Sequence, residues 1–248
     1  MVRFLITIIV CTVLLLPFQS LIAQKIPDTV EIDSFETDVT GDGQDEEIIL
    51  KGVPFSSDSS YYQDVWADVT NELGESWTIT YEGGYEPSLQ LVDLNGDGIK
   101  DIFYQSATGG SGGLYHYQLS TLRNSELNEI PLPVQEYLEG AFDDNFTVIF
   151  RLSPSHKPTE IDVSDRTEEY IRLGIYDEDG NLLEQKSLVI DPIAFYEPFL
   201  ISKSKGYGLK SYQQISGAYH ADQLGTVETL WYFENGAWII LQTEWIPT

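Results

Sequence analysis

The chain has 248 residues, of which 42% are hydrophobic and 12% aromatic, so it can form a buried core and is not a disordered chain. Aspartate and glutamate number 40 against 13 lysines and arginines, and the resulting net charge of -27 argues against binding to nucleic acid, whose phosphates it would repel. The single cysteine, Cys11, excludes an intrachain disulfide, and the three scattered histidines exclude a zinc site built from cysteine and histidine.

The first 23 residues have the order of a secretory signal peptide. Arg3 precedes an apolar run over residues 4–16, Pro17 interrupts it, and Ala23 is a small residue suited to cleavage. The alternative is an uncleaved membrane anchor, although the run is short for crossing a bilayer, which takes about 20 residues. We therefore expect a secreted or cell-surface protein whose mature form, residues 24–248, is one β-repeat domain without a transmembrane span.

The rest of the chain alternates apolar and polar residues in short runs bounded by Gly, Asp, Asn and Pro, which predicts an all-β fold. Hairpin turns are expected at Asp179-Gly180 and Asn235-Gly236, because these residues tolerate a positive φ. A short helix is expected over residues 134–138. In chain order, strands are predicted at 46–53, 65–70, 77–81, 89–93, 101–107, 114–121, 146–152, 170–176, 183–190, 212–215, 227–233 and 238–243.

Two nine-residue loops carry the clearest chemical signal. Residues 38–46 read Asp-Val-Thr-Gly-Asp-Gly-Gln-Asp-Glu, and residues 93–101 read Asp-Leu-Asn-Gly-Asp-Gly-Ile-Lys-Asp. Side-chain oxygens at positions 1, 3 and 5 can converge, glycine at position 6 permits the sharp turn, the carbonyl of position 7 turns inward, and the acid at position 9 closes the shell. Calcium, a hard cation with six to eight oxygen ligands, suits this set.

The two loops are expected to bind two Ca²⁺ ions with unequal strength. The second loop has the fuller oxygen set, whereas Thr40 takes the place of a carboxylate or amide in the first. An EF-hand would need glutamate at position 12, where these loops have Ile49 and Tyr104. The expected ligands are Asp93, Asn95, Asp97, Ile99 (through its carbonyl) and Asp101 in the second loop, and Asp38, Thr40, Asp42, Gln44 (through its carbonyl) and Glu46 in the first.

These loops resemble the calcium loops of FG-GAP and VCBS repeat proteins, including the propeller blades of integrin α-subunits. Over residues 35–246 the chain is similar to secreted VCBS-repeat proteins of Gram-positive, spore-forming bacteria, a likeness carried by both loops and by residues 108–117 and 216–225. The resemblance implies export and calcium binding and no known reaction. A third acidic loop of that family corresponds to residues 200–207, where Lys203 and Lys205 would repel calcium.

The spacing of the loops suggests a repeat. Their first residues, Asp38 and Asp93, are 93 − 38 = 55 positions apart, and the degenerate loop at 200 lies about twice that step further on. Four units of about 50 residues with four strands each would form a small β-propeller. A β-sandwich that carries calcium loops is the alternative architecture.

Other patterns are interpreted as structural. The run Gly109-Gly110-Ser111-Gly112-Gly113 matches a nucleophile elbow, but a strand-like run follows it where a helix would be required. His116 is expected on a strand among tyrosines, and residues 219–222 are expected to form a capped turn.

The function expected from the sequence is that of a non-catalytic extracellular binding module with structural calcium, which contacts a cell-wall glycan or a protein. The alternative is an extracellular polysaccharide hydrolase or lyase that uses carboxylate catalysis. Two facing carboxylates with raised pKa values in a groove would favour the enzyme.

Overall fold

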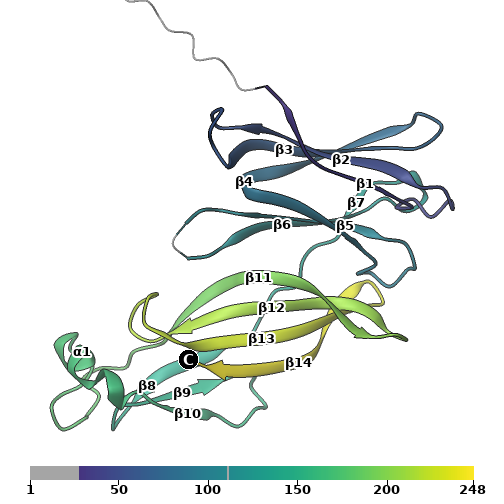
Figure 1. The fold of residues 1–248 in the computed structure, drawn as a ribbon. Helices are drawn as coiled ribbons and strands as arrows, with labels where there is room; N and C mark the ends of the chain where they lie inside the picture. The colour runs from purple at the N-terminus through teal and green to yellow at the C-terminus, as the bar shows by residue number, and fades with distance from the viewer. Residues whose placement is uncertain (1–27, 111) are drawn as a thin grey trace, which may run out of the picture.

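The computed structural model describes residues 28–110 and 112–248, so the predicted signal peptide lies outside the described residues. The chain forms three antiparallel sheets of seven, three and four strands (Figure 1). The all-β prediction is confirmed. The described part contains no helix with the length and apolar character needed to cross a membrane.

The seven-stranded sheet contains its strands in sequence order. Each strand pairs with the next along the chain, so the sheet is a meander in which every connection is local. Its strands are β1 (Val30–Thr37), β2 (Glu46–Pro54), β3 (Tyr61–Thr70), β4 (Ser76–Val92), β5 (Asp101–Ala107), β6 (Tyr115–Thr121) and β7 (Asn128–Glu129).

Strand β4 folds this sheet back on itself. Its first half pairs with β3 as far as Tyr85, and its second half pairs with β5 from Tyr85 onward. The bend is made by Gly83 and Gly84, where any Cβ would overlap neighbouring backbone, and by Glu86, whose φ is +50°. The two halves of the sheet therefore face each other across a core that includes Ile48, Leu50, Val65, Val69, Ile79, Ile102 and Tyr104.

The C-terminal half contains the other two sheets. They are joined to β7 by residues 130–138, which form neither strand nor helix. The elements are β8 (Glu139–Asp143), β9 (Thr147–Arg151), β10 (Thr159–Asp162), the 3-10 turn η2 (Ser164–Arg166), helix α1 (Thr167–Arg172), β11 (Val189–Ser202), β12 (Gly206–Ser216), β13 (Gln223–Glu234) and β14 (Ala237–Pro247); a further 3-10 turn, η1 (Arg123–Ser125), lies before β7.

One face of the four-stranded sheet packs against both of the other sheets. Leu209, Ser211, Gln213 and Ile215 alternate along β12 and are buried, so they share that face. At one end Leu209 joins a cluster with residues of β5 and β6, and at the other Ile215 joins a cluster with residues of β8 and β9. The same sheet thus covers both the seven-stranded and the three-stranded sheets.

Three local predictions are wrong. Residues 170–176 were expected to form a strand, but Thr167–Arg172 is a helix that ends before Gly174 at a φ of +71°. Residues 134–138 were expected to form a short helix but form neither helix nor strand, and Pro131 and Pro133 keep the residues before them out of the helical conformation. Residues 183–188 contribute only a single bridge, between Ser187 and Ala141, before β11 begins.

Both predicted hairpin turns are confirmed. Asn235 and Gly236, with φ values of +53° and +83°, connect β13 to β14, and Gly180 at +82° closes a turn bridged by Tyr176 and Leu182. No sheet closes into a barrel within the described residues. The expected four-bladed propeller and its sandwich alternative therefore remain interpretations of how the folded-back sheet and the two C-terminal sheets are related.

Candidate calcium loops

The two predicted calcium loops lie together at one end of the seven-stranded sheet. The first connects β1 to β2 and the second connects β4 to β5, and the bend in β4 brings them to the same end. A Cβ at Gly41 would overlap the side chain of Ile99, so the loops are in direct contact. Lys100 of the second loop donates from Nζ to Thr37 Oγ1 at the end of β1, at 2.7 Å.

In the first loop, Asp38 organises the turn by accepting backbone N–H groups. Its Oδ1 accepts from Gly41 at 2.6 Å and its Oδ2 from Gly43 at 3.0 Å. Both glycines have a positive φ, which lets their N–H groups point inward. Glu46 at the other end is fully buried and accepts the N–H of Val39 at 2.9 Å. The first and last acids therefore close the loop from its two ends.

The second loop repeats these bonds. Asp93 accepts the N–H of Gly96 at 2.7 Å and that of Gly98 at 2.9 Å. Asp101 is fully buried and accepts the N–H of Leu94 at 2.8 Å. The equivalence of positions 1, 4, 6 and 9, inferred from sequence spacing, thus extends to the hydrogen bonds of both loops.

The middle positions of the loops also correspond. Asp42 accepts the N–H of Gln44 at 2.8 Å, and Asp97 accepts that of Ile99 at 2.9 Å. Position 3 differs between the loops. Thr40 is buried and donates its hydroxyl to Glu46 at 3.1 Å, whereas Asn95 accepts the N–H of Asp97 at 2.9 Å and donates its amide to Asp101 at 2.9 Å.

Burial disfavours the charged form of Asp101, the last acid of the second loop. Burial raises the pKa of Asp101 to about 6, and the nearby Asp97 carboxylate adds to the rise, while the N–H donors of Leu94 and Asn95 oppose it. A cation held in this loop would offset both the lost hydration and the repulsion between the two carboxylates.

One basic residue next to the loops, Arg123, modifies their charge, and its neighbour contacts the first loop. Arg123 Nη1, in η1, lies 3.4 Å from Asp97 Oδ2, and the N–H of the next residue, Asn124, donates to the Thr40 carbonyl at 2.9 Å. The segment that follows β6 therefore covers both loops. Sequence spacing missed Arg123, because it lies outside the nine-residue pattern and reaches the loop only through the fold.

Within each loop the predicted ligands lie near one another, but they do not converge on one point. Among the described residues, no group of three or more acidic, histidine or cysteine side chains is placed to hold a metal ion. The donor set nevertheless fits calcium, since it consists of oxygen atoms alone. A carboxylate oxygen that accepts one N–H keeps a lone pair for a cation. Binding would require these side chains to close in around the ion while the backbone bonds persist.

The degenerate third loop is a tight turn between β11 and β12. Ser202 Oγ accepts the N–H of Lys205 at 3.0 Å, which is the bond between positions 1 and 4 seen in the two acidic loops. Lys205 Nζ lies 4.5 Å from the ring centre of Tyr232, so its ammonium group contacts an aromatic face and not a carboxylate. A hydroxyl thus takes the place of the acid in this bond.

Replacing Lys205 by alanine is expected to lower the free energy of unfolding by about 0.5–1 kcal/mol, because it removes the contact with Tyr232. Lys203 in the same turn is exposed and provides a matched control, whose alanine variant should change stability by less than about 0.5 kcal/mol. Urea unfolding of both variants measures the difference. Equal effects would show that the ring contact does not stabilise the turn.

The other sequence patterns have structural roles. The glycine run 109–113 lies between β5 and β6, so no helix follows it. His116 lies on β6, where its Nδ1 is 2.6 Å from Glu82 Oε2. The predicted capped turn at residues 219–222 is confirmed: Asp222 N donates to the Tyr219 carbonyl at 2.9 Å, and the Asp222 carboxylate accepts the N–H of Ala218 at 2.7 Å.

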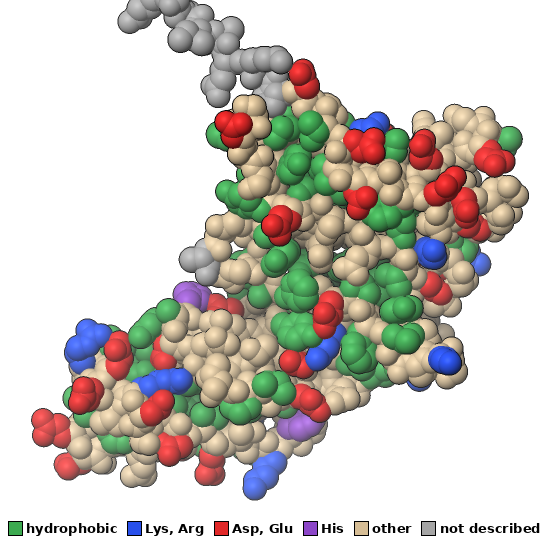
Figure 2. Space-filling view, in the orientation of Figure 1, with side chains coloured by type: hydrophobic (Ala, Val, Ile, Leu, Met, Phe, Trp, Pro, Cys, Tyr) green, Lys and Arg blue, Asp and Glu red, His purple; other side chains and the backbone are tan. Residues whose placement is uncertain are grey.

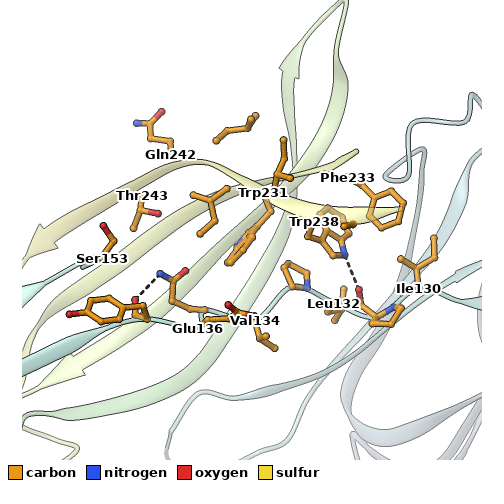
Figure 3. A pocket seen from close by; sticks show the side chains of 18 of the residues that line it. Ile130, Leu132, Val134, Glu136, Ser153, Trp231, Phe233, Trp238, Gln242 and Thr243 are labelled. Atoms are coloured by element: carbon orange, nitrogen blue, oxygen red, sulfur yellow. Dashed lines mark hydrogen bonds between the residues drawn. The ribbon is translucent and has the colours of Figure 1, made fainter. Parts of the chain in front are cut away.

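The surface also contains a groove of about 1200 Å³ on the C-terminal half (Figure 3). Its two long walls are residues 129–137 and residues 236–243, which include the start of β14, and Leu152, Ser153 and His156 line it as well. The indole N–H of Trp238 donates to the Pro131 carbonyl at 2.8 Å and ties one wall to the other. We call this feature the β14 groove.

Comparison with known proteins gives two similarities. Residues 136–246 match the family described as the YybI C-terminal domain, a match that begins just before β8 and ends within β14. The chain is also 27% identical over 224 residues to the uncharacterized protein YybI of Bacillus subtilis (strain 168), covering 84% of this chain and 81% of that protein. No solved structure matches.

Proposed function

We propose that this protein is a secreted, calcium-binding β-repeat protein of the FG-GAP/VCBS type, which acts as a non-catalytic extracellular binding module. Calcium in the loops at 38–46 and 93–101 stabilises the end of the seven-stranded sheet. The folded-back sheet, with one loop for each half, corresponds to two repeats, and the two C-terminal sheets correspond to repeats that have lost their loops.

The observation that carries this proposal is the matched hydrogen bonding of two adjacent loops. In each, the acid at position 1 accepts the N–H groups of positions 4 and 6, and the acid at position 9 is fully buried. A buried carboxylate is unfavourable unless it is paired with a cation or fully hydrogen-bonded. A divalent cation at each loop would supply that pairing. The acidic surface in Figure 2 would in turn favour calcium approaching from the extracellular medium.

The position of Asp101 favours a binding role over hydrolysis. The carboxylic acid whose pKa burial raises, Asp101, lies within the second calcium loop and not in the β14 groove. A glycosidase would require two carboxylates facing each other across a groove, about 5–9 Å apart. The walls of the β14 groove are mainly aliphatic and aromatic, which suits binding.

The proposal predicts two bound calcium ions for the folded protein. Native mass spectrometry after exchange into calcium should count two ions, and calorimetric titration should give dissociation constants on the order of 10⁻⁴–10⁻³ M, as in other extracellular modules. Asp93→Ala together with Asp38→Ala is expected to abolish both. A protein that binds no calcium, or one that keeps both ions in the double variant, would contradict the proposal; a third ion would show that the turn at 202–206 still holds metal.

A further inference from the structure

We infer that the β14 groove binds an extended peptide segment of a partner protein that carries both aliphatic and basic side chains. This inference builds on the binding role proposed above by naming the chemistry of the partner. The shape of the groove supports it. Both long walls are continuous stretches of chain, eight and nine residues long, so the space between them matches a chain in extended conformation better than a compact ligand.

The apolar character of the walls selects aliphatic side chains. Val134 is 67% exposed on one wall, and Ile239, Ile240 and Leu241 are 38%, 49% and 39% exposed on the other. The pairing of β14 with β13 shifts by one residue at Leu241, a bulge that leaves three consecutive aliphatic side chains at the surface. Apolar side chains exposed together in this way mark a binding surface.

Strand β14 also supplies an edge to which a peptide can add. It is the last strand of the four-stranded sheet and pairs with β13 on one side. An edge strand presents backbone N–H and C=O groups that an extended peptide satisfies by adding a strand. Side chains of the added strand would alternate between the groove and solvent.

Charge indicates that the peptide is basic. Glu129 and Glu136 line the groove, and no lysine or arginine is among its described lining residues. The net charge of -27 disfavours a second copy of this chain and attracts a cationic partner. Gln135 also lines the groove, where its Nε2 donates to the Tyr137 carbonyl at 3.1 Å.

The aromatic residues of the groove argue against a glycan as its occupant. Sugar binding uses aromatic faces that are open to solvent, but Trp231 is 4% exposed and donates its N–H to Ser211 at 2.8 Å. The N–H of Trp238 is likewise bonded to Pro131. Trp231 is therefore buried in the wall, and the half-buried Trp238 packs its ring against Phe233 with the ring centroids 5.2 Å apart (Figure 3).

The test measures binding of fluorescein-labelled octapeptides to the full chain by fluorescence anisotropy, in about 150 mM salt. A peptide of alternating valine and lysine is compared with alternating valine and glutamate and with alternating serine and lysine. We expect the valine–lysine peptide to bind at least about tenfold more tightly than either control, a difference of about 1.4 kcal/mol. Equal binding of the serine–lysine peptide would overturn the inference, because it would show attraction by net charge alone.

Variants locate the site. Val134→Lys and Ile240→Lys are each expected to weaken binding of the valine–lysine peptide at least about tenfold. Leu73→Lys is the matched control: it makes the same change of charge at a residue that is 86% exposed in the turn between β3 and β4. It should alter binding less than about twofold. Equal losses in all three variants would overturn the inference.

Two further outcomes would assign the groove to a different occupant and also overturn the inference. One is binding of a chitin or cellulose hexasaccharide that Val134→Lys abolishes. The other is a concentration-dependent dimer, measured by analytical ultracentrifugation, that Ile240→Lys dissociates. The calorimetric calcium titration separates this inference from the calcium proposal, since a protein that binds the peptide but no calcium would reject only the latter.

Discussion

Replacing Asp222 by alanine is expected to lower the free energy of unfolding by about 3 kcal/mol, because it removes a buried carboxylate with three partners. Asp222 is 8% exposed, and its Oδ2 accepts the hydroxyl of Tyr170 and the N–H of Ala218, both at 2.7 Å. Its Oδ1 lies 3.5 Å from Arg166 Nε. The variant leaves a fully buried tyrosine hydroxyl, a backbone N–H and a partly buried guanidinium without their acceptor.

Two variants test whether the carboxylate is the cause. Tyr170→Phe removes one of the three contacts and should lower stability by about 1 kcal/mol. The His220→Ala variant changes the same turn and removes the contact of His220 Nδ1 with Asp191 Oδ1, but the histidine side chain is 79% exposed, so stability should fall by less than about 1 kcal/mol. Urea unfolding at fixed calcium measures all three. A loss below about 1 kcal/mol for Asp222→Ala would show that the turn is held by its backbone bonds alone.

This network gives a physical role to residues 216–225, which the sequence marked only by resemblance. Asp222 connects the turn between β12 and β13 to helix α1, so this motif attaches the helix to the four-stranded sheet. The helix itself was predicted as a strand because of the aromatic and β-branched residues Tyr170 and Ile171. Its true signals were Glu168 and Glu169 in the first turn and Gly174 after the end.

Features fixed by local spacing could be predicted from the sequence, and features that join distant segments could not. The predicted strand 101–107 matches β5 to the residue, and both nine-residue loops have the hydrogen bonds that their spacing implies. The contact of Arg123 with Asp97 and the closure of the β14 groove depend instead on the folded chain. Trp238 and Pro131 are 107 residues apart, and no periodicity links them.

Calcium is expected to raise the melting temperature of this protein by about 5–10 °C for each loop that it saturates. An ion that binds only the folded state stabilises it by about 2.7 kcal/mol at a concentration 100-fold above the dissociation constant. For a chain of 150–250 residues, 1 kcal/mol corresponds to about 2–4 °C. The measurement is a thermal unfolding scan with chelator and with about 10 mM calcium. Magnesium at the same concentration controls for screening of the negative charge, since it demands near-ideal octahedral geometry and keeps several of its waters.

The two loops should differ, and a matched pair of variants separates them. Asp42 and Asp97 both occupy position 5, and each accepts one N–H from the residue two positions on, at 2.8 and 2.9 Å. Their alanine variants therefore lose the same backbone bond without calcium. With calcium, Asp97→Ala should remove the larger part of the shift, because its loop has the amide oxygen of Asn95 at position 3. In the first loop that position is Thr40, whose neutral hydroxyl donates to Glu46 at 3.1 Å. A larger calcium-dependent loss in Asp42→Ala would reverse the ranking and show that the ligand type at position 3 does not decide affinity.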